Sequence, residues 1–200
     1  DFFSRGRSKE KELETDGHEQ TTILLIGCHR VGRYIIESRE DVEKFFVIEH
    51  DPDRFDVLNE LGTPCVYADA TESEVWDKLG PMPNLRMIIS TIPDYEQNIE
   101  ILAIARNRWP GVKVVLAAEQ SDDEQRLLLE KDADYVLSAH TIAGLYIKDG
   151  GLAGIFDLET IASERAKAVE HLNEKLQTWC KHPFCRRHCH LHHKSKRQEG

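Results

Sequence analysis

Short apolar runs alternate with helical stretches along most of this 200-residue chain, and this alternation is the feature that most constrains its fold. Six runs have the length and apolar character of strands buried inside a sheet. They cover residues 21–27, 45–49, 64–68, 87–91, 112–117 and 133–137. Helical patterns cover 31–39, 94–109, 121–131 and 141–148, and Pro52 and Thr71 mark two further helix starts. We therefore predict an α/β fold that is Rossmann-like and doubly wound, with a six-stranded, mostly parallel sheet over residues 21–150.

The segments that flank this domain have a different character. Residues 1–20 are charged and lack an apolar period, which is typical of a linker. Residues 151–179 form a predicted helical arm, because apolar residues between Leu158 and Trp179 recur at spacings of three and four. This helix docks on its own domain or packs against another copy, and the sequence leaves both open. Residues 180–200 form a predicted disordered tail that is basic and rich in Cys and His.

Charge and hydropathy exclude several classes of function. The net charge is −10, and the first 180 residues hold 20 basic and 35 acidic groups, so the body is too acidic for a nucleic-acid partner. The sequence contains no apolar run of 18 residues, so we predict no membrane span within it. The first twenty residues lack the apolar stretch of a signal peptide. We expect a cytosolic chain, or a cytosolic piece of something larger.

The tail concentrates potential metal ligands without a recognisable spacing. Three of the five cysteines and five histidines lie within residues 180–193. Cys180, Cys185 and Cys189 match no common zinc site, so we predict no metal site and keep regulatory metal binding as the alternative. The basic residues of the tail are either solvated or lie near anionic lipid headgroups. The spread of the cysteines is not that of a secreted disulfide framework, which indicates a reducing compartment.

The motif that carries chemistry is the sequence GCHRVG at residues 27–32, between the first predicted strand and its helix. A dinucleotide fold needs Gly-x-Gly-x-x-Gly at this point, for a tight turn, for backbone approach to the pyrophosphate and for close packing of helix on strand. Gly27 and Gly32 fit the first and third roles. His29 stands at the second, where its β-carbon narrows the path to the phosphates, although a protonated His29 would attract one.

An acidic residue is expected about 20 positions further on, where it would hold a ribose hydroxyl pair. Glu49 lies 22 residues after Gly27, at the end of the second predicted strand. Its negative charge would repel a 2′-phosphate, which argues against NADP. Strand, turn, helix, strand and acid together favour a nucleotide-binding fold. The alternative is a doubly wound domain that has lost its nucleotide because of His29.

Five blocks of the sequence resemble, in the same order, the regulator of K⁺ conductance (RCK) domain. They are ILLIGCHRVGRYI, FFVIEHDPDRFDVLNELG, VYADATESEVWDKLG, MIISTIPDYEQNIEILAIAR and VVLAAEQSDDEQRLLLEKDADYVLSAH, and they span about residues 21–148. RCK domains are cytosolic nucleotide-sensing domains of potassium channels, potassium uptake systems and cation/proton antiporters. The blocks IPDYEQN and ADYVLSAH are more similar to the domain at the cytosolic C-terminus of monovalent cation/proton antiporters than to that of channels.

The resemblance implies a set of nucleotide-binding residues. The 27–32 turn would hold the phosphates, Glu49 and the adjacent His50 would lie at the ribose, and Asp69 and Ala70 would lie beside the adenine. Thr91 would form the floor of the cleft. The full set is Gly27, His29, Arg30, Val31, Gly32, Glu49, His50, Asp69, Ala70 and Thr91. Ala68 replaces the glycine of the family's Gly-Asp-Ala-Thr block. His50 and Asp51 could also be considered as a catalytic pair, but they follow a strand in a turn and are more simply interpreted as part of a solvated loop.

The resemblance also implies a function. The chain would be the cytosolic regulatory domain of a membrane K⁺ or Na⁺/proton antiporter. It would sense AMP, ADP, ATP or NAD(H), but not NADP, and signal to the attached transporter through a homodimer formed by the 141–148 helix. One alternative is the RCK domain of a potassium channel or uptake system. Others are a dimerisation domain that binds nothing, or a small NAD-dependent oxidoreductase. We find no catalytic constellation, so we expect no enzyme.

Overall fold

The computed structural model describes residues 20–37, 44–119, 121–148, 167, 169 and 170. The predicted linker, helical arm and Cys/His-rich tail therefore lie, apart from residues 20, 167, 169 and 170, outside the described residues. The backbone divides into two compact units, Asp1–Leu137 and Ser138–Gly200, and each is described by itself.

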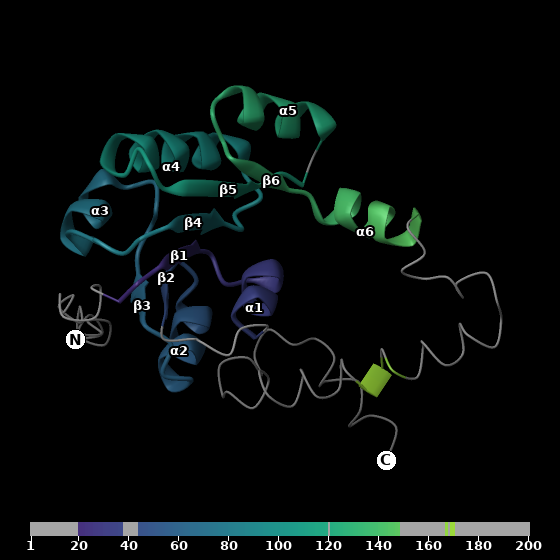
Figure 1. Ribbon diagram of the computed structural model, residues 1–200. Helices are drawn as coiled ribbons and strands as arrows, with labels where there is room; N and C mark the ends of the chain where they lie inside the picture. The colour runs from purple at the N-terminus through teal and green to yellow at the C-terminus, as the bar shows by residue number, and fades with distance from the viewer. Residues whose placement is uncertain (1–19, 38–43, 120, 149–166, 168, 171–200) are drawn as a thin grey trace, which may run out of the picture. The chain divides into compact units, whose positions relative to one another are not determined.

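The first unit is a six-stranded sheet with helices on both faces (Figure 1). The strand order is β3-β2-β1-β4-β5-β6, and every neighbouring pair is parallel. The predicted doubly wound fold is confirmed. The strands are β1 (Ile23–Ile26), β2 (Phe45–Glu49), β3 (Cys65–Tyr67), β4 (Met87–Ser90), β5 (Lys113–Ala117) and β6 (Tyr135–Leu137). The helices are α1 (Arg30–Glu37), α2 (Pro52–Glu60), α3 (Ser73–Leu79), α4 (Tyr95–Arg108) and α5 (Asp122–Glu130).

The largest described cluster of core residues lies between the sheet and one layer of helices, and further buried side chains such as Val47 and Leu58 lie outside it. Figure 1 shows α3, α4 and α5 on one side of the sheet and α1 and α2 on the other. Trp76 of α3, Ile101 of α4 and Leu128 of α5 are fully buried in one cluster with side chains of the central strands. The strand residues in that cluster alternate along the chain, as in Leu24 and Ile26, because successive strand side chains point to opposite faces.

Helix starts follow local capping chemistry. Asp51 caps α2 by accepting hydrogen bonds from the next two free N–H groups, and Pro52 occupies the first turn. Asp94 caps α4 in the same way. The expectation that Thr71 caps α3 is wrong, because α3 begins at Ser73 and the Thr71 hydroxyl instead donates to the Asp69 carboxylate, 2.7 Å away.

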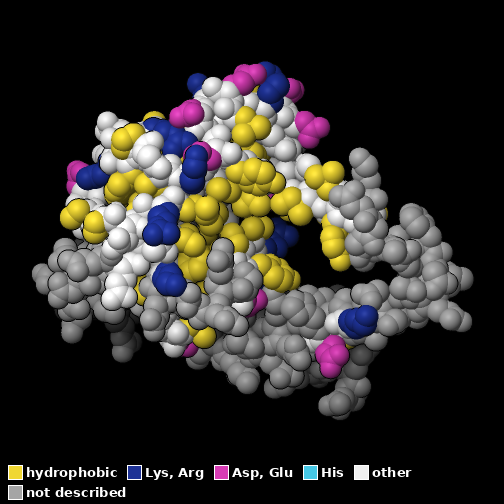
Figure 2. Space-filling view, in the orientation of Figure 1, with side chains coloured by type: hydrophobic (Ala, Val, Ile, Leu, Met, Phe, Trp, Pro, Cys, Tyr) yellow, Lys and Arg dark blue, Asp and Glu magenta, His cyan; other side chains and the backbone are white. Residues whose placement is uncertain are grey.

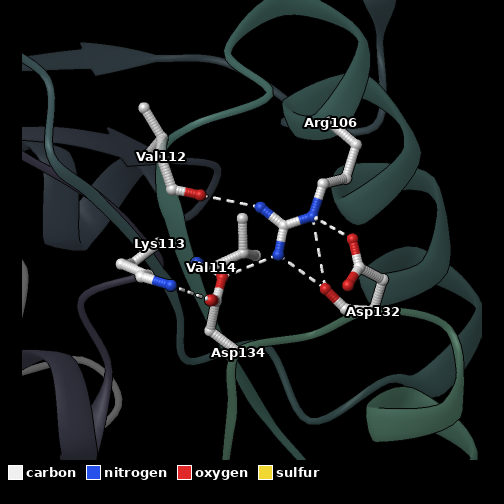
Figure 3. Close-up of polar contacts among 6 residues, drawn as sticks. All are labelled: Arg106, Val112, Lys113, Val114, Asp132 and Asp134. Carbon is white, nitrogen blue, oxygen red and sulfur yellow. Dashed lines mark hydrogen bonds and ion pairs between the residues drawn. The ribbon is translucent and has the colours of Figure 1, made fainter.

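A polar clamp joins α4 to the starts of β5 and β6 (Figure 3). Arg106 donates to the Asp134 carboxylate at 2.6 Å and also pairs with Asp132. Lys113 Nζ lies 2.7 Å from the other Asp134 oxygen, and the Val114 N–H donates to Asp134 at 2.8 Å. Burial alone would raise the pKa of Asp134, but its bonds to Lys113, Arg106 and the Val114 N–H hold the pKa well below the usual value.

The described part of the second unit is Ser138, helix α6 (Ala139–Lys148) and residues 167, 169 and 170. Helix α6 begins two residues before the predicted start, because the Ser138 hydroxyl oxygen accepts a hydrogen bond from the Thr141 N–H at 3.2 Å. Its large apolar side chains are exposed, as Figure 2 shows in yellow: Ile142, Leu145, Tyr146 and Ile147. Within the described residues, no helix has both the length and the apolar character that crossing a bilayer requires.

Candidate functional site

The predicted site residues come together at the carboxyl edge of four neighbouring strands. The 27–32 turn follows β1, and Glu49 and His50 lie at the end of β2. Asp69 and Ala70 follow β3, and Thr91 follows β4. The chain reverses its winding direction between β1 and β4, which is where open α/β sheets leave a crevice for ligands.

The two glycines of the turn have separate structural roles. Gly27 has a φ of +78°, in the left-handed region that side chains other than glycine rarely adopt. A Cβ on Gly32 would lie 2.3 Å from the Gly27 carbonyl oxygen, so only glycine lets α1 approach the end of β1 this closely. These are the tight turn and the close helix packing that the spacing predicts.

Thr91 fixes the turn from the other side. Its hydroxyl donates to the Gly27 carbonyl oxygen at 2.9 Å, and its N–H donates to the Ile26 carbonyl oxygen at 2.9 Å. A Cβ on Gly27 would lie 3.1 Å from the Thr91 hydroxyl. The floor of the crevice is therefore a packed junction of β1 with β4.

Glu49 holds the turn to the end of β2. Its side chain is almost fully buried, and one carboxylate oxygen accepts from the Cys28 N–H at 2.6 Å. The other oxygen accepts from the N–H groups of His50 and Asp51, each at 2.8 Å. A carboxylate offers about four acceptor positions, and three are taken. About one acceptor position is left, and the ribose role of Glu49 stays a prediction.

The thiol of Cys28, the residue whose N–H donates to this carboxylate, is unreactive. The side chain is fully buried, and burial together with the nearby Glu49 charge raises the pKa of its thiol to about 12. The thiol therefore stays protonated at neutral pH and acts as a small apolar group.

The mouth of the turn carries charges of both signs, positive from Arg30 and Arg54 and negative from Asp51 and Glu49. His29 and Arg30 are exposed, and Val31 is half-buried. Partial burial lowers the pKa of His29 below 6.5, and the charges of Arg54 and Arg30 lower it further. The guanidinium groups near His29 are therefore those of Arg30 and of Arg54, and Arg54 pairs with Asp51 at 3.9 Å. The sequence reasoning missed Arg54, whose only signal is its place in the first turn of α2.

The turn after β3 is closed by its own side chains. One Asp69 carboxylate oxygen accepts from the Thr71 N–H at 2.9 Å and from the Thr71 hydroxyl, which lowers the pKa of Asp69. Ala70 is buried, and its carbonyl oxygen accepts from Trp76 Nε1 at 2.7 Å. The Ala68 N–H donates to the Glu49 carbonyl oxygen at 3.0 Å, which keeps this turn beside Glu49.

His50 is exposed at the outer side of the site. Its imidazole stacks on the ring of Tyr67, with centroids 6.1 Å apart and planes 14° from parallel. The ring of Phe55 in α2 also packs on Tyr67, with ring centroids 5.8 Å apart. Tyr67 is half exposed, and it pairs in register with Glu49 across β2 and β3. The sequence analysis did not predict this aromatic group, because no motif spacing relates its three residues.

The fold and the glycine turn define a Rossmann-like domain of the nucleotide-binding type. The chain belongs to the TrkA-N domain family, whose pattern matches residues 23–139. This confirms the resemblance to RCK domains that the sequence blocks indicate.

The curated relatives are potassium-efflux proteins. The chain is 25% identical over 126 residues to the glutathione-regulated potassium-efflux system protein KefC of Cronobacter sakazakii, covering 61% of the chain and 20% of KefC. It is 24% identical over 174 residues to KefC of Salmonella arizonae, and this match covers 83% of the chain and 27% of KefC. The chain thus spans about a fifth to a quarter of these relatives.

Solved structures share the fold. The TrkA-N domain of the inner membrane protein ybaL from Escherichia coli has a TM-score of 0.58 and 28% identity, covering 64% of this chain and 95% of that one. The C-terminal domain of Kef from Shewanella denitrificans, in an AMP-bound form, has a TM-score of 0.52 and 15% identity. That match covers 79% of this chain and 96% of the Kef domain. The GsuK channel bound to NAD has a TM-score of 0.51 and 22% identity, and the match covers 59% of this chain and 21% of GsuK.

Proposed function

We propose that this chain is a cytoplasmic regulatory domain of a KefC-like cation/proton antiporter, and that it binds an adenine nucleotide or NAD(H). One observation carries the proposal. Glu49, the ribose acid by spacing, is buried against the glycine turn through the Cys28 N–H and keeps an acceptor position for a hydroxyl. The acid and the phosphate turn are therefore held together before any ligand arrives.

The charges of the site support the class of ligand. Arg30 and Arg54 lie near enough to His29 to lower its pKa, so a phosphate at the turn would meet two guanidinium groups. Glu49 faces the position of a ribose and would repel a 2′-phosphate, which excludes NADP from the proposal. Two structural neighbours are complexes with AMP and with NAD, which fits this class.

Regulation fits the site better than catalysis. A dehydrogenase would need an acid or base close to Thr91, where the fourth strand ends. The nearest carboxylate along the chain, that of Asp94, caps α4 by accepting from the Gln97 N–H at 2.9 Å. Cys28 is buried and protonated. These placements support a regulatory site rather than a catalytic one.

A sensor must pass its bound state to a partner. Helix α6 exposes four large apolar side chains, and an exposed apolar cluster of this kind is typical of an interaction surface. We propose that α6 contributes to a homodimer and that the dimer transmits the signal to the attached transporter. The ligand achieves this by binding two arrangements of the dimer with different affinity.

Calorimetric titration tests the proposal. AMP, ADP, ATP, NAD⁺, NADH and NADP⁺ are each titrated into the 200-residue chain. The proposal predicts saturable heat for at least one of the first five and weaker or absent binding of NADP⁺. Absence of heat with all six, at concentrations up to the millimolar range, would favour the alternative of a dimerisation domain that has lost its nucleotide.

A further inference from the structure

Trp76 holds the carbonyl group at the centre of the turn after β3. Its ring is fully buried in the core, and its Nε1–H donates to the Ala70 carbonyl oxygen at 2.7 Å. Ala70 is itself 3% exposed, so water does not replace this bond readily. The indole therefore satisfies a buried acceptor in the segment that is predicted to flank the adenine.

The start of α3 lacks the side-chain hydrogen bond that caps other helices. In the described helices α2, α4 and α5, the side chain before the first turn accepts a hydrogen bond from the helix N-terminus. Glu72, at the same position of α3, makes no such side-chain bond. Backbone bonds from the Ala68 N–H to the Glu49 carbonyl and from the Glu72 N–H to the Asp69 carbonyl hold the two ends of the 69–71 turn. The Ala70 carbonyl group between them is held by the bond from Trp76.

The indole ring is fixed from the side of α4. Trp109 packs against it with centroids 5.8 Å apart and planes at 53°. Arg108 lies over the Trp109 ring at 5.8 Å and pairs with Asp77 of α3 at 2.7 Å. Because Asp77 is next to Trp76 in the chain, α3 and the end of α4 together set the direction of the indole N–H.

We propose that Trp76 is a positioning residue of the nucleotide site. It holds the 69–71 turn, through the Ala70 carbonyl group, in the place where the turn and Glu49 flank the same ligand. This inference rests on the proposed function. It adds a residue that lies in the core and not in the crevice. Nucleotide affinity would depend on the hydrogen bond of this residue as well as on its packing.

Two phenylalanine variants separate the hydrogen bond from the packing. Trp76→Phe keeps an aromatic ring but removes the N–H, whereas Trp109→Phe removes similar bulk from the same pair and leaves the bond to Ala70. We expect AMP affinity, measured by calorimetry, to weaken about 3- to 10-fold in Trp76→Phe and to change by less than about twofold in Trp109→Phe. Both variants should melt at a lower temperature than the wild type.

The outcomes distinguish the two proposals. If the wild type binds AMP and Trp76→Phe binds it equally well, the positioning role is overturned and the sensor survives. An equal loss of affinity in both variants also overturns it, because the effect is then one of packing. If the wild type binds none of the adenine nucleotides or NAD(H), the proposed function fails and the inference fails with it.

A measurement on the wild type covers the case in which Trp76→Phe does not fold. The indole Nε1–H proton of each tryptophan gives a separate NMR signal. We expect the Trp76 signal to exchange slowly with solvent and to shift on addition of AMP, while the Trp109 signal shifts much less. A Trp76 signal that stays unchanged while AMP saturates the protein would overturn the inference.

Discussion

The carboxylate of Glu49 accepts a 2.6 Å hydrogen bond from the backbone N–H of Cys28, and this bond joins the ends of β1 and β2. Two further N–H groups, from His50 and Asp51, donate to the same side chain. The residue that spacing assigns to a ribose is thus also the anchor of the phosphate turn. Its substitution must affect folding and binding together.

Glu49→Gln tests this double role. The amide keeps the shape of the side chain but turns one acceptor into a donor, which then faces a backbone N–H. We expect the free energy of unfolding to fall by about 1–3 kcal/mol, measured by urea denaturation. Nucleotide binding should weaken at least tenfold, or about 1.4 kcal/mol.

Glu100→Gln is the matched control, because Glu100 is exposed on α4. It should change the free energy of unfolding by less than about 0.5 kcal/mol. Equal effects of the two substitutions would mean that the buried bonds of Glu49 contribute nothing specific.

Gly32→Ala tests the close approach of α1 to β1. The added Cβ would meet the Gly27 carbonyl oxygen at 2.3 Å, so backbone must move. We expect a loss of about 1–3 kcal/mol in the free energy of unfolding. Gly111→Ala is the control, since no atom lies within 4 Å of its Cβ position, and its effect should be within about 0.5 kcal/mol. A Gly32→Ala variant as stable as Gly111→Ala would contradict the packing described for the turn.

The Arg106–Asp134 clamp predicts how stability depends on pH (Figure 3). The pKa of Asp134 lies below its unfolded value of 3.8, so its contribution is present above that value and is lost as the pH falls through the folded pKa. Asp134→Asn should cost about 1–3 kcal/mol at pH 7. It should also flatten the loss of stability between about pH 5 and about pH 2.

Asp77→Asn serves as the comparison for the clamp. Its carboxylate pairs with Arg108 but is 73% exposed, so the cost should stay below about 1 kcal/mol. An acid profile of Asp134→Asn that follows the wild type would show that other carboxyl groups dominate acid unfolding.

His29 predicts a pH dependence of NAD⁺ affinity. Its pKa is lowered in the unliganded protein, and a pyrophosphate at the turn would raise it, so binding takes up a proton. Affinity should therefore increase about two- to fivefold from about pH 8 to about pH 6, a range in which NAD⁺ itself does not titrate. Calorimetry should show no such increase in His29→Gln, whereas His140→Gln should keep it. A slope that persists in His29→Gln would assign the proton to another group.

Helix α6 predicts the oligomeric state. Leu145 is 51% exposed, and Leu145→Asp places a charge among the apolar side chains of this helix. We expect light scattering to give a dimer for the wild type and a monomer for Leu145→Asp. Leu129→Asp, at an equally exposed site on α5, should remain a dimer. A dimer that survives Leu145→Asp would move the interface away from α6.

The sequence predicts the sheet and the glycine turn because both depend on local spacing. Alternating strands and helices are sufficient for the doubly wound class, and Gly27, Gly32 and Glu49 fall at the expected distances. The start of α4 is equally local, since Asp94 lies three residues before its partner Gln97.

Contacts that depend on how turns and helices pack could not be predicted from spacing. Thr71 and Glu74 have the spacing of a capping box, but Asp69 accepts from both the N–H and the hydroxyl of Thr71, so α3 starts later. Trp76 lies in a stretch that reads only as helix, and its bond to Ala70 depends on how α3 packs. Arg54 reaches the neighbourhood of His29 because α2 starts beside the glycine turn.

The most direct test of the central claim is to map the ligand on the protein by NMR. AMP is titrated into the ¹⁵N-labelled chain, and the shift of each backbone N–H signal is followed. The account predicts saturable shifts concentrated at residues 27–32, 49–51 and 69–71, with those of α5 nearly unchanged. Shifts at another surface, or none at millimolar AMP and NAD⁺, would contradict a nucleotide sensor at the carboxyl edge of β1 to β4.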